Sequence, residues 1–146
     1  MRINLKIRLY RPDDKSRLRN IWRAASAVGH PFFTENQLDQ QADAVRDVYL
    51  PKAENWIAVM DGTPVGFIGL LGQFVGGLFV DPAFHSRGIG RALVAHAAEI
   101  KGPLELEVYA RNSRALSFYQ RLGFIEVSRR DTDDHGFPFE LVRLER

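Results

Sequence analysis

The sequence predicts a single α/β domain in which a mixed, mostly antiparallel sheet carries helices on both faces. The spacing of apolar residues switches repeatedly between about two and about 3.6, so strands and helices are interspersed along the chain. Its 146 residues, 45% hydrophobic and 26% charged, fit one globular domain. Because no repeat, low-complexity tract or linker divides the chain, we treat residues 1–146 as one domain.

The first third of the chain predicts one strand and two helices. Residues 3–10 alternate in polarity, as a strand does. After Pro12, apolar residues recur at intervals of three and four, which indicates one buried helical stripe. Thr34 and Gln37 have the spacing of a capping box that begins a second helix, and Pro51 is expected to end it. The inner face of this helix is expected to contain Leu38, Ala42, Val45 and Tyr49.

The remainder predicts strands interrupted by two further helices. Three strands are expected at 56–60, 65–74 and 78–80, with a hairpin turn at Asp61-Gly62 between the first two. A helix is expected from Ile89 to Lys101, a strand at 104–109, a helix from Asn112 or Ser113 to Leu122, and final strands at 124–130 and 139–144. Asp131, Asp133 and Asp134 are expected in a solvated turn between these last strands.

Composition excludes several classes of protein. The absence of cysteine excludes disulfides, a cysteine nucleophile and thiolate zinc sites, and it favours a cytoplasmic location. No apolar run approaches the roughly 20 residues of a membrane helix, and no metal-ligand spacing is present, so neither a membrane nor a metal is expected. The formal net charge of +2 is too small to indicate a nucleic-acid partner.

The segment from His85 to Arg91 is the most informative part of the sequence. A strand ends, a loop with glycines at 88 and 90 follows, and an amphipathic helix begins within the glycine pair. Backbone N–H groups at a helix start bind phosphate oxygens, and Arg87 and Arg91 add positive charge. Glycines at a helix start also serve as simple turns, so this segment alone leaves both interpretations open.

Two blocks of the sequence resemble the GCN5-related N-acetyltransferases, the GNAT family. His85-Ser86-Arg87-Gly88-Ile89-Gly90 is similar to the family's Arg/Gln-x-x-Gly-x-Gly/Ala motif, with His85 in place of the usual Arg or Gln. Residues 106–124 are similar to the family's strand, its Asn-x-x-Ala helix start and its Phe-Tyr-x-x-x-Gly-Phe ending. The resemblance implies a GNAT fold and direct transfer of acetyl from acetyl-CoA, as co-substrate, to a small-molecule or peptide amine in a ternary complex.

The resemblance also implies a cofactor-binding set. The backbone of Leu78, Phe79 and Val80 is expected to pair with the pantetheine arm beside a β-bulge. The phosphates are expected to meet the segment that contains His85, Ser86, Arg87, Gly88, Ile89, Gly90 and Arg91. Asn112 is expected to cap the last helix and to hydrogen-bond the pantetheine or a water.

Tyr119 and Glu107 are the expected catalytic residues. Tyr119 stands where the family places the tyrosine that protonates the departing thiolate, although its spacing also suits core packing. Glu107 stands where related protein N-terminal acetyltransferases place a base, and a solvated carboxylate or a water chain is the alternative. His30, Phe32 and Phe33 fall in the loop that usually shapes the family's acceptor pocket.

Three further expectations concern partners and alternatives. A non-catalytic acyl-CoA-binding or regulatory module would share this fold, and a small nucleic-acid binder could use the basic first 23 residues. A homodimer is plausible for the family. Residues 24–84 carry 7 acidic and 2 basic residues, which favours a cationic acceptor if this block borders the acceptor site.

Overall fold

The computed structural model describes residues 4–29, 33–133, 136 and 138–146. The strands are β1 (Leu5–Leu9), β2 (Glu54–Met60), β3 (Thr63–Leu71), β4 (Phe74–Val80), β5 (Glu105–Tyr109), β6 (Ile125–Arg130) and β7 (Leu141–Glu145). The α-helices are α1 (Lys15–Gly29), α2 (Glu35–Ala44), α3 (Leu50–Lys52), α4 (Ile89–Lys101) and α5 (Ser113–Arg121). Shorter helical turns are η1 (Pro12–Asp14), η2 (Val45–Tyr49) and η3 (Pro82–Phe84).

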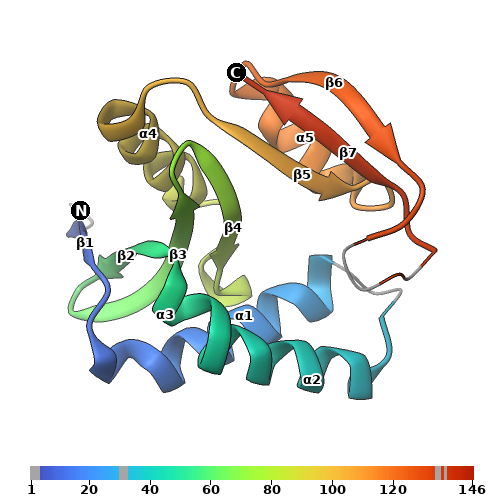
Figure 1. Ribbon diagram of the computed structural model, residues 1–146. Helices are drawn as coiled ribbons and strands as arrows, with labels where there is room; N and C mark the ends of the chain where they lie inside the picture. The colour runs from blue at the N-terminus through green and yellow to red at the C-terminus, as the bar shows by residue number, and fades with distance from the viewer. Residues whose placement is uncertain (1–3, 30–32, 134–135, 137) are drawn as a thin grey trace.

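The seven strands form one sheet in the order β1-β2-β3-β4-β5-β7-β6. Every neighbouring pair is antiparallel except β4 and β5, which are parallel. Helices α4 and α5 cover one face, and α1 and α2 lie side by side across the other (Figure 1). The predicted mixed, mostly antiparallel sheet with helices on both faces is confirmed.

Strands β4 and β5 separate soon after they meet. They pair only through Phe74 with Glu105 and Val75 with Leu106, and beyond these residues they diverge (Figure 1). On its other side, β4 carries an extra residue: Gly69 pairs with Gly77 and Leu70 with Val75, so Gly76 is bulged. The divergence of β4 and β5 therefore divides the sheet into two halves, one of strands β1 to β4 and one of strands β5 to β7.

Each face of the sheet has its own hydrophobic core. The core under α4 and α5 contains Ile68, Val75, Ile89, Leu93, Leu106, Tyr119, Phe124 and Leu144, among others. The core under α1 and α2 contains Leu18, Ile21, Trp22, Phe33, Leu38, Ile57 and Phe67, among others. The core under α1 and α2 also contacts β4, because the ring centroids of Trp22 and Phe79 lie 6.0 Å apart.

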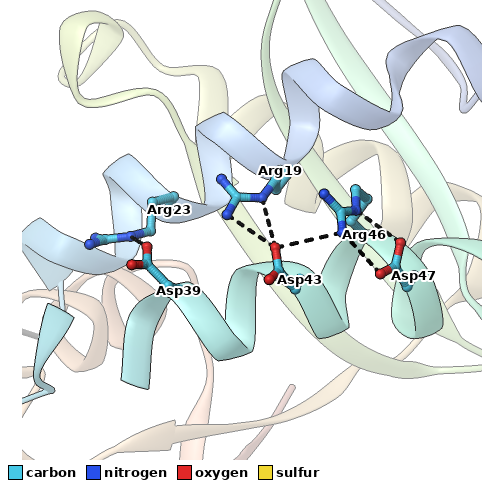
Figure 2. Close-up of polar contacts among 6 residues, drawn as sticks. All are labelled: Arg19, Arg23, Asp39, Asp43, Arg46 and Asp47. Atoms are coloured by element: carbon cyan, nitrogen blue, oxygen red, sulfur yellow. Dashed lines mark hydrogen bonds and ion pairs between the residues drawn. The ribbon is translucent and has the colours of Figure 1, made fainter. Parts of the chain in front are cut away.

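A ladder of ion pairs fastens α2 to α1. It consists of Arg19 and Arg23 of α1, Asp39 and Asp43 of α2, and Arg46 and Asp47, which continue it into η2 (Figure 2). Arg23 Nε donates to Asp39 at 2.9 Å, and Arg23 also contacts Glu35. Arg19 donates to Asp43 at 3.1 Å. Since Asp39 and Asp43 lie one turn apart, the arginines of α1 fix the rotation of α2 as well as its position.

Three sequence expectations need correction. The strand expected at 65–74 is two strands, because Gly72 adopts a left-handed φ of +60° and closes a hairpin between Leu71 and Phe74. Pro51 is not the last helical residue, because η2 and α3 continue α2 without a break and the helical structure ends one residue later, at Lys52. Tyr49, expected on the inner face, is exposed because the wide turn η2 shifts the helical phase before it.

Candidate active site

A cavity of about 540 Å³ occupies the split between β4 and β5. Its walls come from the diverging halves of these two strands, the loop before α4, the start of α5 and the last turns of α1. A splayed parallel pair exposes backbone N–H and C=O groups that a continuous ladder would have used. The cavity is therefore placed where an extended ligand can pair with β4 as an added strand.

The loop between β4 and α4 has the conformation of an anion cradle. Ser86 and Gly88 adopt left-handed φ values of +65° and +77°, and α4 begins directly after Gly88. A Cβ on Gly88 would meet nothing within 4 Å, so it is the conformation that requires glycine there. Gly90 is different, because its Cβ would lie 3.2 Å from Phe118 Cζ. One glycine shapes the loop, and the other allows α4 to approach α5.

Two polar side chains hold this loop against the sheet. His85 Nε2 lies 3.1 Å from the carbonyl oxygen of Val80, so the histidine folds back onto the end of β4. Asp81 accepts hydrogen bonds from the Ala83 N–H and from Arg17 of α1. Burial alone would raise the pKa of Asp81, but these hydrogen bonds outweigh it and lower the pKa below its ordinary value. The cradle is thus anchored before any ligand arrives.

One end of the cavity is basic. Arg91 of α4 and Arg114 and Arg121 of α5 line it, and all three are exposed. Within the described residues none of the three forms an ion pair. Arg87 does not line the cavity; its guanidinium lies 5.3 Å from the Phe84 ring centre. Arg91 lies in the first turn of α4, Arg114 at the start of α5 and Arg121 in its last turn, and this unpaired positive charge is of the kind that suits phosphate groups.

Tyr119 lies in the wall of the cavity on the α5 face. Its ring is buried between Phe118 and Phe124, with ring centroids 5.1 and 5.4 Å away. In the described part of the chain no group hydrogen-bonds its hydroxyl. Burial raises the pKa of Tyr119 above its ordinary value, so the hydroxyl keeps its proton and is available as a donor.

Asn112 starts α5 in the way expected from the sequence. Its Oδ1 accepts a hydrogen bond from the Ala115 N–H at 3.1 Å, which is an N-cap. The residue also lines the cavity. The predicted capping role is confirmed, and the amide nitrogen of the same side chain is left for other partners.

The other end of the cavity is acidic and aromatic. Glu107 of β5 accepts two hydrogen bonds from Arg130, at 2.9 and 3.0 Å, so the guanidinium fixes the orientation of its carboxylate. Asp133 is buried and accepts a hydrogen bond from the Tyr109 hydroxyl at 2.9 Å. Phe33 packs edge-on against Tyr109, at 5.4 Å, and belongs to the α1–α2 core.

The cavity brings together most of the residues singled out in the sequence. Its lining includes Leu78, Phe79, Val80, His85, Ser86, Gly88, Ile89, Gly90, Arg91, Glu107, Asn112 and Tyr119. Phe33 packs beside the acidic end without lining it, and His30 and Phe32 lie outside the described residues. The bulge expected beside Leu78 lies at Gly76.

The lining also includes residues that were not singled out from the sequence, among them Ser26, Arg114, Arg121, Arg130 and Asp133. The seven-residue spacing of Arg114 and Arg121 places both on one face of a helix, and this signal was available. Asp133 was expected in a solvated turn but is buried. Its burial depends on a hydroxyl that approaches from β5, which local sequence does not encode.

Two features are absent from the described residues. They contain no group of three or more His, Cys, Asp or Glu side chains placed to hold a metal ion. No helix in the same part of the chain has the length and apolar character needed to cross a membrane.

Comparisons with known proteins agree with this geometry. The family model described as "Acetyltransferase (GNAT) domain" matches residues 51–126. A peptidyl-lysine N-acetyltransferase, YjaB, of Salmonella typhimurium is 36% identical over 96% of this chain and 97% of its own. The solution structure of apo YjaB from Escherichia coli superposes with a TM-score of 0.89, at 35% identity over 97% of each chain.

A third comparison concerns the fold alone. The PaiA N-acetyltransferase of Thermoplasma acidophilum, solved in complex with coenzyme A, has a TM-score of 0.79. It is 19% identical and covers 96% of this chain and 98% of its own. Together with the family model and the YjaB relatives, this shared architecture establishes that the chain belongs to the GNAT family and is an N-acetyltransferase.

Proposed function

We propose that this enzyme transfers acetyl from acetyl-CoA directly to the ε-amine of a lysine in a protein or peptide, with both substrates bound at once. The observation that carries the proposal is one cavity that passes between β4 and β5 and differs in chemistry at its two ends. A basic end suits phosphates, and an acidic end suits a cationic amine. The peptidyl-lysine activity named for the YjaB relative supports the choice of lysine.

The described residues fit acetyl-CoA as a co-substrate. Backbone N–H groups at Gly88 and the first turn of α4, with the arginines of the basic end, suit the pyrophosphate. The free side of β4 beyond its bulge suits the pantetheine amides. Acetyl-CoA would supply the activated acyl group. The named complex of PaiA with coenzyme A, in the same fold, supports this assignment.

Glu107 is placed to prepare the acceptor. A lysine ammonium has no lone pair until it loses a proton, since its ordinary pKa is about 10.4. Glu107 shares the face of β5 that carries Tyr109, toward α1 and α2, and it lines the cavity. It accepts that proton directly or through one water, while Arg130 holds the carboxylate in a fixed orientation.

Tyr119 is placed to stabilise the leaving group. The neutral amine attacks the thioester carbonyl carbon, a C–N bond forms and the C–S bond breaks. The nitrogen then loses one proton to solvent water, and the sulfur must gain a proton or a strong hydrogen bond. Tyr119 belongs to the core on the α4–α5 face, opposite Glu107. Its hydroxyl keeps its proton because burial raises its pKa. The apolar surroundings disfavour an unpaired thiolate for the same reason, so donation by Tyr119 lowers the barrier.

The test uses a peptide with a blocked N-terminus and a single lysine. We expect the wild-type enzyme to release coenzyme A thiol and to form acetyl-lysine in equal amounts, measured by a thiol reagent and by mass spectrometry. The control peptide carries arginine in place of the lysine. Thiol release without acetyl-lysine, or acetylation only of a free peptide N-terminus, would contradict the proposal.

A further inference from the structure

Ser26 interrupts the buried face of α1 with a polar group. Leu18 and Trp22 precede it on the same stripe at intervals of four, and both are buried. Ser26 is 1% exposed, yet its hydroxyl has no hydrogen-bond partner. It is also a wall residue of the cavity, together with Ala25 and Val28. A position that packing alone would fill with an apolar side chain therefore carries an unused hydroxyl at the site.

An unpartnered buried hydroxyl is costly. Leaving such a group without a hydrogen bond destabilises a folded protein by about 1–3 kcal/mol. A serine that serves only to pack would lower this cost by bonding a carbonyl one turn earlier in its helix, as mid-helix serines commonly do. Ser26 forms no such bond, so in the folded protein without ligand its hydroxyl remains able both to donate and to accept a hydrogen bond.

The position of Ser26 in the fold places it at the end of the cavity proposed for the acceptor. Trp22, one turn earlier on α1, packs on Phe79 of β4, so Ser26 approaches the cavity from the α1–α2 face. Tyr109 packs against the core on the same face, and Glu107, two residues earlier, shares its side of β5. The arginines of the basic end come from α4 and α5, on the opposite face. A ligand group that reaches Ser26 is therefore at the far end from the phosphates.

We infer that the Ser26 hydroxyl binds the acceptor amine, accepting a hydrogen bond from one of its N–H groups. A deprotonated lysine amine has two N–H donors and one lone pair. When Ser26 holds one N–H, the lone pair has fewer orientations available, and attack on the thioester is favoured. Rotation about the single χ1 bond moves the hydroxyl among three staggered positions, and the inference requires the one that faces the cavity. This inference rests on the proposed lysine acetyltransferase activity.

The test compares Ser26→Ala with Ser26→Thr, which keeps the hydroxyl. The matched control is Ser16→Ala, on the exposed face of the same helix. With the single-lysine peptide, we expect Ser26→Ala to raise the KM of the peptide about three- to tenfold, the worth of one hydrogen bond. The KM of acetyl-CoA should stay unchanged, and Ser26→Thr should restore most of the loss.

Thermal unfolding of the ligand-free protein gives a second readout. Since Ser26→Ala removes an unsatisfied group, its Tm should equal or exceed that of the wild type. An unchanged peptide KM in Ser26→Ala would overturn the inference, as would a lower Tm with equal rises in both KM values, which indicates a structural role. A wild-type enzyme that does not acetylate the lysine peptide would instead refute the proposed function, and this inference with it.

Discussion

The two halves of the cavity are built from different kinds of interaction. Around α4 and α5, the geometry depends on backbone conformation: left-handed residues at Ser86 and Gly88, a bulge at Gly76 and a capped helix start at Asn112. Around α1 and α2, it depends on side-chain pairs, namely the arginine ladder and the fixed Glu107 carboxylate. Backbone geometry suits a ligand that is always the same, whereas side-chain pairs can vary with the acceptor.

The largest expected effect on kcat is that of replacing Tyr119, where the two halves of the cavity meet. We expect Tyr119→Phe to lower kcat tenfold or more, because the departing thiolate loses its donor, with little change in acetyl-CoA affinity. Steady-state kinetics and calorimetric binding measure both quantities, with exposed Tyr49→Phe as the control. Full turnover in the variant would refute the assignment.

The same residue makes a prediction about pH. Burial raises the pKa of Tyr119 above its ordinary value of about 10, so its protonated, active form persists as the pH rises to 10. We therefore expect no loss of kcat from ionisation of Tyr119 below pH 10. An alkaline decline below pH 10 that disappears in Tyr119→Phe would be inconsistent with this environment.

On the acceptor side, Glu107→Gln should lower kcat about tenfold near neutral pH, because amide nitrogen and oxygen accept no proton there. Glu105→Gln is the matched control, since Glu105 lies two residues earlier on β5, pairs with Arg143 at 2.8 Å and does not line the cavity. If the two variants have equal kcat values, a water chain, and not Glu107, carries the proton.

On the cofactor side, Gly88→Ala should raise the KM of acetyl-CoA about fivefold, because a left-handed φ costs an alanine about 1–2 kcal/mol and distorts the cradle. Gly62→Ala introduces comparable strain at φ +85° in the β2–β3 hairpin, away from the cavity. Both variants should lose stability in thermal unfolding. An equal rise in acetyl-CoA KM for both would show that the loop has no special role.

Removal of one unpaired charge should have a smaller effect. Arg121→Gln is expected to raise the KM of acetyl-CoA about threefold at low salt, and less at high salt, because an exposed phosphate contact is screened. The control variant is Arg129→Gln, since Arg129 already forms ion pairs with Glu126 and Glu140 at 2.9 Å. A salt-independent KM in both variants would mean that the basic end does not meet phosphates.

The smallest effect is expected at the ladder. Asp43→Asn weakens the exposed pairs that Asp43 of α2 makes with Arg19 of α1 and Arg46 of η2. Each is worth about 0.2–1 kcal/mol, so the Tm should fall by a few degrees at most. The acceptor KM should respond before the acetyl-CoA KM, because α2 lies on the acceptor side. A change in the KM of acetyl-CoA without a change in the KM of the acceptor would contradict this prediction, because it would link the ladder to the half of the cavity around α4 and α5.

The geometry around α4 and α5 is predicted well from the sequence because most of its determinants are local. The turn at Gly88, the Asn112 cap and the amphipathic period of α4 and α5 each act within one turn of their own residues, whereas Gly90 acts at a distance, on Phe118. The hairpin at Gly72 was missed because the apolar run of β3 continues across it into β4. Local pattern cannot separate two buried strands when no strong turn pair marks the boundary.

The acceptor half was less predictable because its determinants are distant pairs. The acidic residues of 24–84 favoured a cationic acceptor, but the structure does not support that reason. Glu35, Asp39, Asp43, Asp47, Glu54 and Asp81 are paired with Arg or Lys. None of the acidic residues of this block lines the cavity. The acidic lining comes instead from Glu107 and Asp133, which β5 and the segment after β6 bring together.

Initial-rate kinetics test the central claim, that one cavity holds both substrates while acetyl passes between them. Rates are measured over a grid of acetyl-CoA and lysine-peptide concentrations and plotted as reciprocals. Direct transfer in a ternary complex predicts lines that intersect. Parallel lines, the pattern of a covalent acetyl-enzyme, would contradict the account.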